Sequence, residues 1–217
     1  MARNKYPEQT IEKILSISTK LFLENGYDKT TIQDILDELQ MSKGAVYHHF
    51  KSKEEILEEI ISKRTAYAET LMKHLILTTT AVNACEKIRK IILLFISDMD
   101  GRSIDSILSG QIKNPQFVVA GLKSSVQGDA EIISKLFLEG IEDGSIHTEY
   151  PLECAELFML LLNIWINPVL FSRDSNQTRR RLEFLKDSMK RLGVDIITEE
   201  IIQTTIDTYK NMNAFKK

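Results

Sequence analysis

The chain has 217 residues, 43% of them hydrophobic, and a formal net charge of −3. This length allows one or two domains with a sizeable core, and the acidic balance argues against a protein that coats nucleic acid without regard to sequence. Only 9 glycines and 4 prolines are present, and strand-like alternation is sparse, so long helices are expected throughout.

No segment has the features of an export signal or a membrane span. Met1–Glu8 is polar, and the most apolar run, residues 157–166, is interrupted by Asn163 and is too short to cross a bilayer. Cys85 and Cys154 lie far apart without metal-ligand spacing, which favours reduced, buried thiols. We therefore expect a cytoplasmic protein that makes no membrane contact.

The N-terminal part of the chain predicts three helices followed by a long fourth one. Apolar residues at helical spacing begin after Pro7, and Gly26 suits the left-handed position that ends this helix. The fourth helix is expected to extend toward Ile76. Each of the three later helices is preceded by a hydroxyl residue suited to cap its start, namely Thr31, Ser42 and Ser52.

The third of these helices, Ser42–His49, carries the strongest functional signal. Its first turn holds a lysine and a glycine, and an aromatic residue and two imidazoles follow. A helix with little bulk in its first turn and polar tips around it fits the major groove of DNA. Residues 1–64 contain 11 acidic and 10 basic residues, so a DNA-binding face requires the basic side chains to gather on one side.

The second half of the chain is also expected to be helical. Helical spacing and turn residues predict helices at residues 81–99, 114–142, 151–171, 177–192 and 198–214. Gly121 and Gly128 are expected to weaken the second of these, and Pro168 to bend or break the third.

Two of these helices have patterns that suit side-by-side packing. Leu157–Ile166 is apolar nearly all round, and leucine or methionine recurs at three- and four-residue steps in residues 182–192. Both helices could be ordinary core, but we favour pairing with the same helices of a second copy. The interface residues expected on this basis are Leu157, Leu161, Leu182, Leu185, Met189 and Leu192.

No arrangement of residues predicts catalysis, a cofactor or a metal site. The histidines are His48, His49, His74 and His147, with no metal-binding or nucleophile motif around them and no phosphate-binding glycine loop. Adjacent residues on a helix point about 100° apart, so His48 and His49 are not expected to share a metal ion.

The segment from Gly26 to Leu57 resembles the DNA-binding domain of the TetR family of bacterial transcriptional regulators. The matching residues are Gly26-Tyr27, Thr30-Thr31, Ile35, Ser42-Lys43-Gly44, Val46-Tyr47-His48-His49-Phe50, Ser52-Lys53-Glu54 and Leu57. Beyond residue 65 the resemblance extends only to the helical architecture. Leu36 and Gln40 stand where the family usually has Ala and Gly, so Gln40 must adopt a backbone geometry that glycine normally provides.

The resemblance implies an all-α fold with two domains. Residues 1–52 would form a three-helix, helix-turn-helix DNA-binding domain, and residues 53–217 a larger helical domain for effector binding and dimerisation. A homodimer would place one recognition helix per subunit in successive major grooves of a pseudo-palindromic operator. The residues expected to face DNA are Thr31, Ser42, Lys43, Gly44, Ala45, Tyr47, His48 and Lys53. For Thr31 and Lys53 the alternative is capping alone, and for Lys43 it is a solvated surface lysine.

The resemblance also implies a pocket for a small-molecule effector in the C-terminal domain. Its expected lining is Phe95, Met99, Phe117, Phe158, Met159 and Trp165, although each could instead be plain core. This lining is mostly apolar and favours a lipophilic effector. The effector would act by moving the helix that begins after Ser52.

The resemblance implies a ligand-responsive transcriptional regulator, and repression is the family's common mode. The alternative is a helical dimeric protein that sequesters a ligand or partner and has lost sequence-specific DNA binding, which the near-neutral N-terminal region and Gln40 motivate. An enzyme is the least favoured hypothesis.

Overall fold

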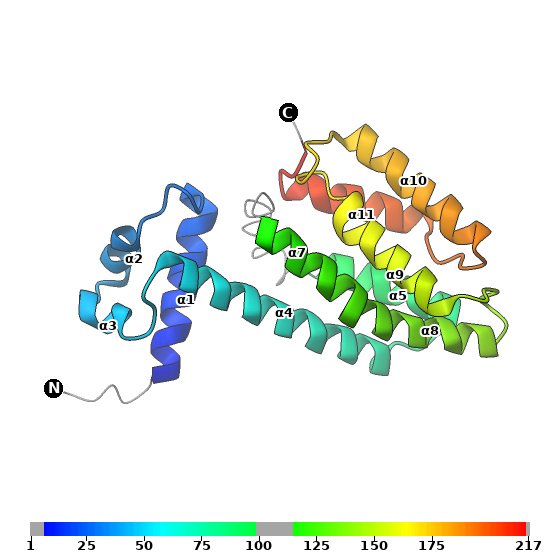
Figure 1. Ribbon diagram of the computed structural model, residues 1–217, viewed down its shortest axis with the longest axis horizontal. Helices are drawn as coiled ribbons and strands as arrows, with labels where there is room; N and C mark the ends of the chain where they lie inside the picture. Colours follow the sequence, from blue (N-terminus) through cyan, green and yellow to red (C-terminus); the bar gives the residue numbers. More distant parts are fainter. Residues whose placement is uncertain (1–6, 99–114, 216–217) are drawn as a thin grey trace. The chain divides into compact units, whose positions relative to one another are not determined.

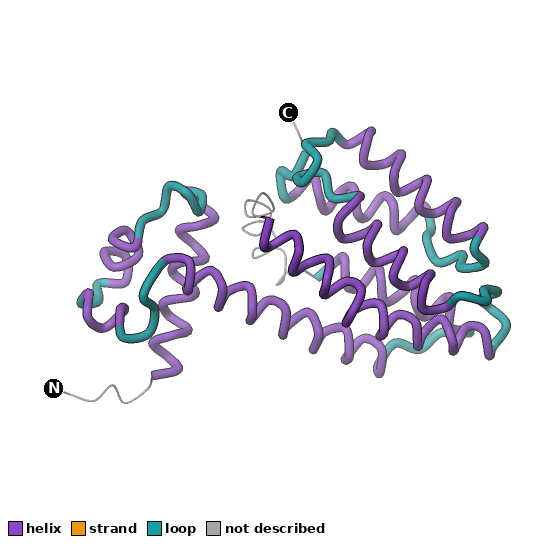
Figure 2. The backbone as a smooth tube through the Cα atoms, viewed as in Figure 1, coloured by secondary structure: helices purple, strands orange, loops and turns teal. Residues whose placement is uncertain are grey.

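The computed structural model describes residues 7–98 and 115–215, in which every regular element is helical (Figure 1). Figure 2 shows helices joined by short loops in this part of the chain. The helices are α1 (Pro7–Asn25), α2 (Ile32–Leu39), α3 (Lys43–Tyr47), α4 (Lys53–Thr78), α5 (Ala84–Ser97), α7 (Pro115–Ser124), η1 (Ser125–Asp129), α8 (Ala130–Glu142), α9 (Pro151–Leu160), η2 (Leu161–Trp165), α10 (Ser175–Arg191) and α11 (Glu199–Asn211). The predicted all-α fold is confirmed.

The described residues divide into two compact units, the first ending at Thr70 and the second beginning at Leu71. The core of the first unit joins α1, α2, the segment around α3 and the start of α4. Its fully buried members are Ile14, Ile35, Val46 and Ile56. Since the first turns of α4 contribute to this core, the division by compactness falls inside α4 rather than before it.

The second unit has a larger core, built from α5, α8, α9, α10 and α11. Its fully buried side chains include Ile88, Phe137, Ile166, Leu185 and Ile202. Helices α8 and α9 form an antiparallel pair, and α11 packs against both α5 and α10. Burial of this much apolar surface is the main stabilising contribution to the second unit.

Residues far apart in the sequence hold the helix ends of the second unit in place. The Asp143 carboxylate accepts from the backbone N–H of Ala84 at 2.6 Å, and the Ser145 hydroxyl accepts from that of Cys85 at 3.1 Å. The α8–α9 loop thus caps the start of α5. Gly193, at φ +82°, accepts from the backbone N–H of His147 at 2.9 Å.

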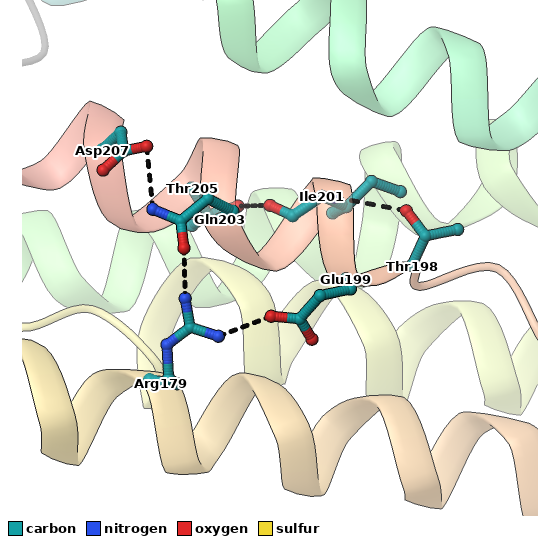
Figure 3. Close-up of polar contacts among 7 residues, drawn as sticks. All are labelled: Arg179, Thr198, Glu199, Ile201, Gln203, Thr205 and Asp207. Atoms are coloured by element: carbon teal, nitrogen blue, oxygen red, sulfur yellow. Dashed lines mark hydrogen bonds and ion pairs between the residues drawn. The ribbon is translucent and has the colours of Figure 1, made fainter.

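A surface network fastens α11 to α10 (Figure 3). Arg179 on α10 pairs with Glu199 at 2.6 Å and also donates to Gln203, which in turn donates to Asp207 at 2.9 Å. Thr198 caps α11 by accepting from the backbone N–H of Ile201 at 3.2 Å. The charge of Arg179 is therefore paired within its own chain.

Two stretches that the sequence analysis treated as simple α-helix contain π-helical turns. Residues 125–129 include Gly128, one of the predicted weak points, and residues 161–165 follow α9 directly. Asn163 donates to the buried hydroxyl of Ser125 at 3.1 Å, so the two π-helical turns are joined by a polar contact. Pro168 lies beyond η2, where the predicted break occurs.

Candidate DNA-binding surface

The start of α2 is fixed by a reciprocal cap. The Thr31 hydroxyl accepts from the backbone N–H of Asp34 at 3.2 Å, and the Asp34 carboxylate accepts from the backbone N–H of Thr31 at 2.8 Å. The backbone N–H and the hydroxyl of Thr31 both donate to the Asp34 carboxylate, and these two hydrogen bonds lower its pKa. Thr31 is exposed beside its cap, which leaves its position at a helix N-terminus open to a phosphate group.

The turn between α2 and α3 has the geometry that its sequence required. Gln40 adopts the left-handed conformation at φ 52° and ψ 36°, and its backbone N–H donates to the carbonyl of Asp37 at 3.2 Å. The Ser42 hydroxyl accepts from the backbone N–H of Ala45 at 3.3 Å and caps α3. The predicted cap and the expected glycine-like conformation of Gln40 are both confirmed.

Helix α3 has one buried side chain, and its other residues are exposed or half-buried. Val46 is fully buried in the first core, whereas Lys43, Gly44 and His48 are exposed. A Cβ atom added to Gly44 would meet nothing within 4 Å. The exposed face of α3 therefore has a flat first turn, which allows a backbone to approach the edges of bases in a major groove.

The polar tips around α3 are arranged as pairs. The Lys43 ammonium lies 5.5 Å from the centre of the Tyr47 ring, and the rings of His48 and His49 meet edge to face at 5.1 Å. Ala45 and Tyr47 are half-buried. Lysine, tyrosine and histidine supply donors for phosphate and base acceptors, and the Ala45 methyl could contact a thymine methyl.

Lys53, also expected to face DNA, has a different environment. Its ammonium donates to the backbone carbonyl of Tyr27 at 2.8 Å and lies 4.2 Å from the centre of the Tyr27 ring. This contact could not be predicted from residue spacing, because positions 27 and 53 are 26 residues apart. The Ser52 hydroxyl caps α4 through the backbone N–H of Glu55 at 3.2 Å, as predicted.

The effector-pocket candidates have mixed positions. Phe158 is buried, while Phe95, Met159 and Trp165 are half-buried and pack against the core of the second unit. Met99 and the side chain of Phe117 lie outside the described residues. The Ser125–Asn163 pair between η1 and η2 is a polar feature that the sequence analysis missed.

The dimer-interface candidates separate into two groups. Leu182, Leu185 and Met189 are at most 1% exposed within their own chain, so they contribute to the core and cannot meet a second copy without unfolding it. Leu157 and Leu192 are exposed, and Leu161 is half-buried. The periodicity correctly indicated that one face of α10 is apolar. It could not show whether that face packs against helices of the same chain or against a second copy.

Phe184, an exposed aromatic residue that the sequence pattern did not single out, lies on the same helix as Leu182, Leu185 and Met189. Phe184 on α10 is 58% exposed, and its ring meets the Trp165 ring at 5.7 Å. The Arg181 guanidinium lies 5.5 Å from the Trp165 ring centre. Tryptophan, phenylalanine and arginine are enriched at protein–protein interfaces.

No group of three or more His, Cys, Asp or Glu side chains in residues 7–98 and 115–215 is placed to hold a metal ion. Both cysteines are buried free thiols, and burial raises the pKa of Cys85. No helix in the described part of the chain is long and apolar enough to cross a membrane.

A capped helix, a left-handed turn and a second capped helix with a flat, exposed first turn define a helix-turn-helix protein. Residues 14–60 match the family of bacterial regulatory proteins described as the tetR family. The match covers α2, the turn and α3 together with most of α1 and the start of α4.

Similar proteins extend this match. The chain is 43% identical over 51 residues to the transcriptional regulator QacR of Staphylococcus aureus, a match that covers 24% of this chain and 27% of QacR. It is 23% identical over 158 residues to the transcriptional repressor KstR2 of Mycolicibacterium smegmatis, covering 70% and 75% of the two chains. Residues 14–60 therefore form a domain of the tetR type, and the protein is a helix-turn-helix transcriptional regulator.

The same fold is found in solved structures. A transcriptional regulator from Cytophaga hutchinsonii superimposes with a TM-score of 0.60 over 94% of this chain and 95% of its own, at 19% sequence identity. At this identity the likeness concerns the fold of the chain.

Proposed function

We propose that the protein is a repressor that binds a pseudo-palindromic operator as a homodimer and is released by a small, lipophilic effector. The observation that supports DNA binding most directly is the exposed face of α3, where Lys43, Tyr47 and His48 surround an open first turn at Gly44. The proposal includes a cytoplasmic location and no catalytic role.

The operator follows from the symmetry of a homodimer. Two copies of α3 would enter successive major grooves, with half-sites about 34–36 Å apart, or one turn of DNA. Lys43, Tyr47 and His48 would contact bases or phosphates, while Thr31 and Ser42 would place the helix N-termini close to phosphates. Ala45 would contact a base edge.

The second copy would dock on the exposed apolar face of α9 and α10. Leu157, Phe184 and Leu192 are exposed there, and Trp165 with Arg181 lies beside Phe184. Burial of such a face in a symmetric interface would remove large apolar side chains from water. The residues Leu182, Leu185 and Met189 are not part of this proposal.

The effector would bind in the C-terminal unit near Phe95, Phe158, Met159 and Trp165. These side chains would favour a lipophilic ligand, and the Asn163–Ser125 pair would supply a polar contact. The dimer would have two states, one with its recognition helices spaced to fit the operator and one with them spaced differently. The effector would relieve repression because it binds more tightly to the second state.

Selection of genomic DNA fragments by the purified protein at stated salt tests the proposal. We expect enrichment of a short pseudo-palindrome with half-sites about one turn apart. No enrichment over bulk DNA would instead favour a protein that sequesters a ligand.

A glycine pair then tests the role of α3 in that binding. The replacement Gly44→Ala should leave the fold intact, because its methyl group meets nothing within 4 Å. Operator affinity should nevertheless fall about tenfold or more, since the methyl group faces the groove. Gly128→Ala is the matched control, as it also meets nothing within 4 Å but lies in η1. Equal affinities of both variants and the parent would remove α3 from the DNA surface.

The dimer is tested with a second pair. Phe184→Glu should convert the dimer to a folded monomer, as measured by sedimentation, because it would bury a charge in the interface. Val82→Glu is the control, since Val82 is 90% exposed in the α4–α5 loop, and this variant should remain dimeric. A dimeric Phe184→Glu variant would place the interface elsewhere.

A further inference from the structure

Tyr27 lies at the meeting point of three segments of the first unit. It follows Gly26, whose φ of +85° ends α1, and its ring meets Phe22 of α1 edge to face at 5.1 Å. The turn that carries it is fixed by the buried Thr30, whose hydroxyl donates to the carbonyl of Gly26 at 2.9 Å. This turn leads directly into Thr31, the cap of α2, so its position sets where α2 begins.

Two residues in the first turn of α4 contact Tyr27. The Lys53 ammonium donates to the Tyr27 carbonyl at 2.8 Å and stacks on its ring at 4.2 Å. The Tyr27 hydroxyl donates to the Glu54 carboxylate at 3.2 Å. Adjacent residues of α4 therefore hold the backbone and the ring tip of one tyrosine.

The protonation states suit this arrangement. Burial and the Glu54 charge raise the pKa of Tyr27 to about 12, so the phenol remains a donor at neutral pH. The pKa of Glu54 is lowered, chiefly by its own backbone N–H and the Ser52 hydroxyl, so its carboxylate remains an acceptor. A hydrogen bond with an ionised partner is stronger than one between neutral groups.

We propose that Tyr27, Lys53 and Glu54 form a clamp that positions the start of α4 against the turn before α2, and that Lys53 serves DNA binding through this clamp rather than as a phosphate contact. The clamp is a positioning device for α2 and α3. This inference rests on the proposed DNA-binding function, because the benefit of the positioning appears in operator affinity.

The two tyrosine-facing lysines of this unit differ in a way that makes the clamp testable. Lys43 lies 5.5 Å from the Tyr47 ring and is exposed on α3, whereas Lys53 is half-buried and bonded to a carbonyl. A lysine that neutralises a phosphate contributes about one to the slope of log affinity against log salt concentration. A lysine that acts only by positioning changes affinity without changing this slope.

The experiment measures operator affinity over a range of salt for Lys53→Met and for the matched control Lys43→Met. Methionine keeps an unbranched apolar chain and removes the charge. We expect Lys53→Met to bind about fivefold or more weakly than the parent with an unchanged slope, and Lys43→Met to lower the slope by about one. A slope that also falls by about one in Lys53→Met would overturn the proposal, and so would an unchanged affinity.

A measurement without DNA separates failure of the clamp from failure of the proposed function. In Lys53→Met, backbone amides of residues 26–35 should exchange hydrogen faster than in the parent, because the turn before α2 loses its support. Lys43→Met should leave them unchanged. Tyr27→Phe retains the ring and its contact with Lys53 but loses the Glu54 bond, so it should give a smaller change of the same kind. Unchanged exchange in both clamp variants would reject the clamp even if the protein binds no DNA.

Discussion

The helices α2 and α3 of the first unit are capped only by close neighbours in the sequence, whereas the start of α5 in the second unit also receives hydrogen bonds from distant residues. Thr31 caps through Asp34 and Ser42 through Ala45, in each case three positions away. Helix α5 receives hydrogen bonds from Asp143 and Ser145, which are 59 and 60 positions away from their partners. Local caps can be predicted from sequence, but a cap supplied by another helix hairpin cannot.

The comparison also explains how exposed residues are used in each unit. In the first, Val46 is the one buried residue of α3, and Lys43, Gly44 and His48 nearby are exposed to solvent. In the second, Leu182, Leu185 and Met189 of α10 are buried in the chain's own core. Only neighbouring residues such as Phe184 and Leu192 are exposed and able to contact another protein. Substitutions in the second unit should therefore alter stability more than those in the first.

The largest effect is expected at Gly193, where distant segments touch. In Gly193→Ala the new Cβ would lie 1.9 Å from the carbonyl oxygen of His147, in a backbone conformation with φ +82°. The free energy of unfolding should fall by about 3 kcal/mol or more, since a backbone clash adds to the left-handed strain. Urea unfolding monitored by circular dichroism measures this. A loss below about 1 kcal/mol would show that the loop shifts freely.

Alanine substitutions at Leu185, within α10, and at Leu192, at its C-terminal end, compare a core position with a proposed interface position. Leu185→Ala should reduce the free energy of unfolding by about 2–5 kcal/mol, because Leu185 is fully buried. Leu192→Ala, at a side chain that is 39% exposed, should lower stability by less than about 1 kcal/mol at concentrations where the protein is monomeric. A similar decrease in the free energy of unfolding in both variants would contradict the assignment of Leu185 to the core and Leu192 to the exposed surface.

In the first unit the local turn offers a stabilising change. Gln40→Gly should raise the free energy of unfolding by roughly 1 kcal/mol or less, because glycine adopts the left-handed conformation without strain but loses more chain entropy on folding. The measurement is the thermal midpoint of the parent and the variant at one protein concentration. A lower midpoint would mean that the Gln40 side chain makes a stabilising contribution.

The smallest change is expected at Asp143 and appears only in acid. The hydroxyl of Ser145 and the N–H of Ala84 lower the pKa of Asp143 below its ordinary value. Its stabilising contribution is therefore complete above the unfolded-state pKa of about 3.9 and is lost as the pH falls through the lower folded value. Asp143→Asn should remove this part of the acid dependence, as shown by unfolding curves measured between neutral and acidic pH. An unchanged acid dependence would mean that the Asp143 contacts are not formed in solution.

The sequence predicted the fold class and the elements of the first unit closely. The caps at Thr31, Ser42 and Ser52 and the end of α1 at Gly26 were all found, because each depends on residues within one helical turn. The left-handed conformation of Gln40 was expected from the family resemblance, because glycine usually stands at this position. The hydrogen bond from Lys53 to the Tyr27 carbonyl was not predicted, because it joins residues that are 26 positions apart.

By itself, the sequence determined which segments are helical, where most of them begin and end, and which short helix presents an open first turn to a ligand. Hydrogen bonds over three or four residues and apolar periodicity carry that information. Only the tertiary structure decided that Leu182, Leu185 and Met189 belong to the chain's own core, that Asp143 caps α5, and that Lys53 is bonded to Tyr27. These outcomes depend on which surfaces meet after the chain folds. A periodic pattern shows which face of a helix is apolar, but it does not show what packs against that face.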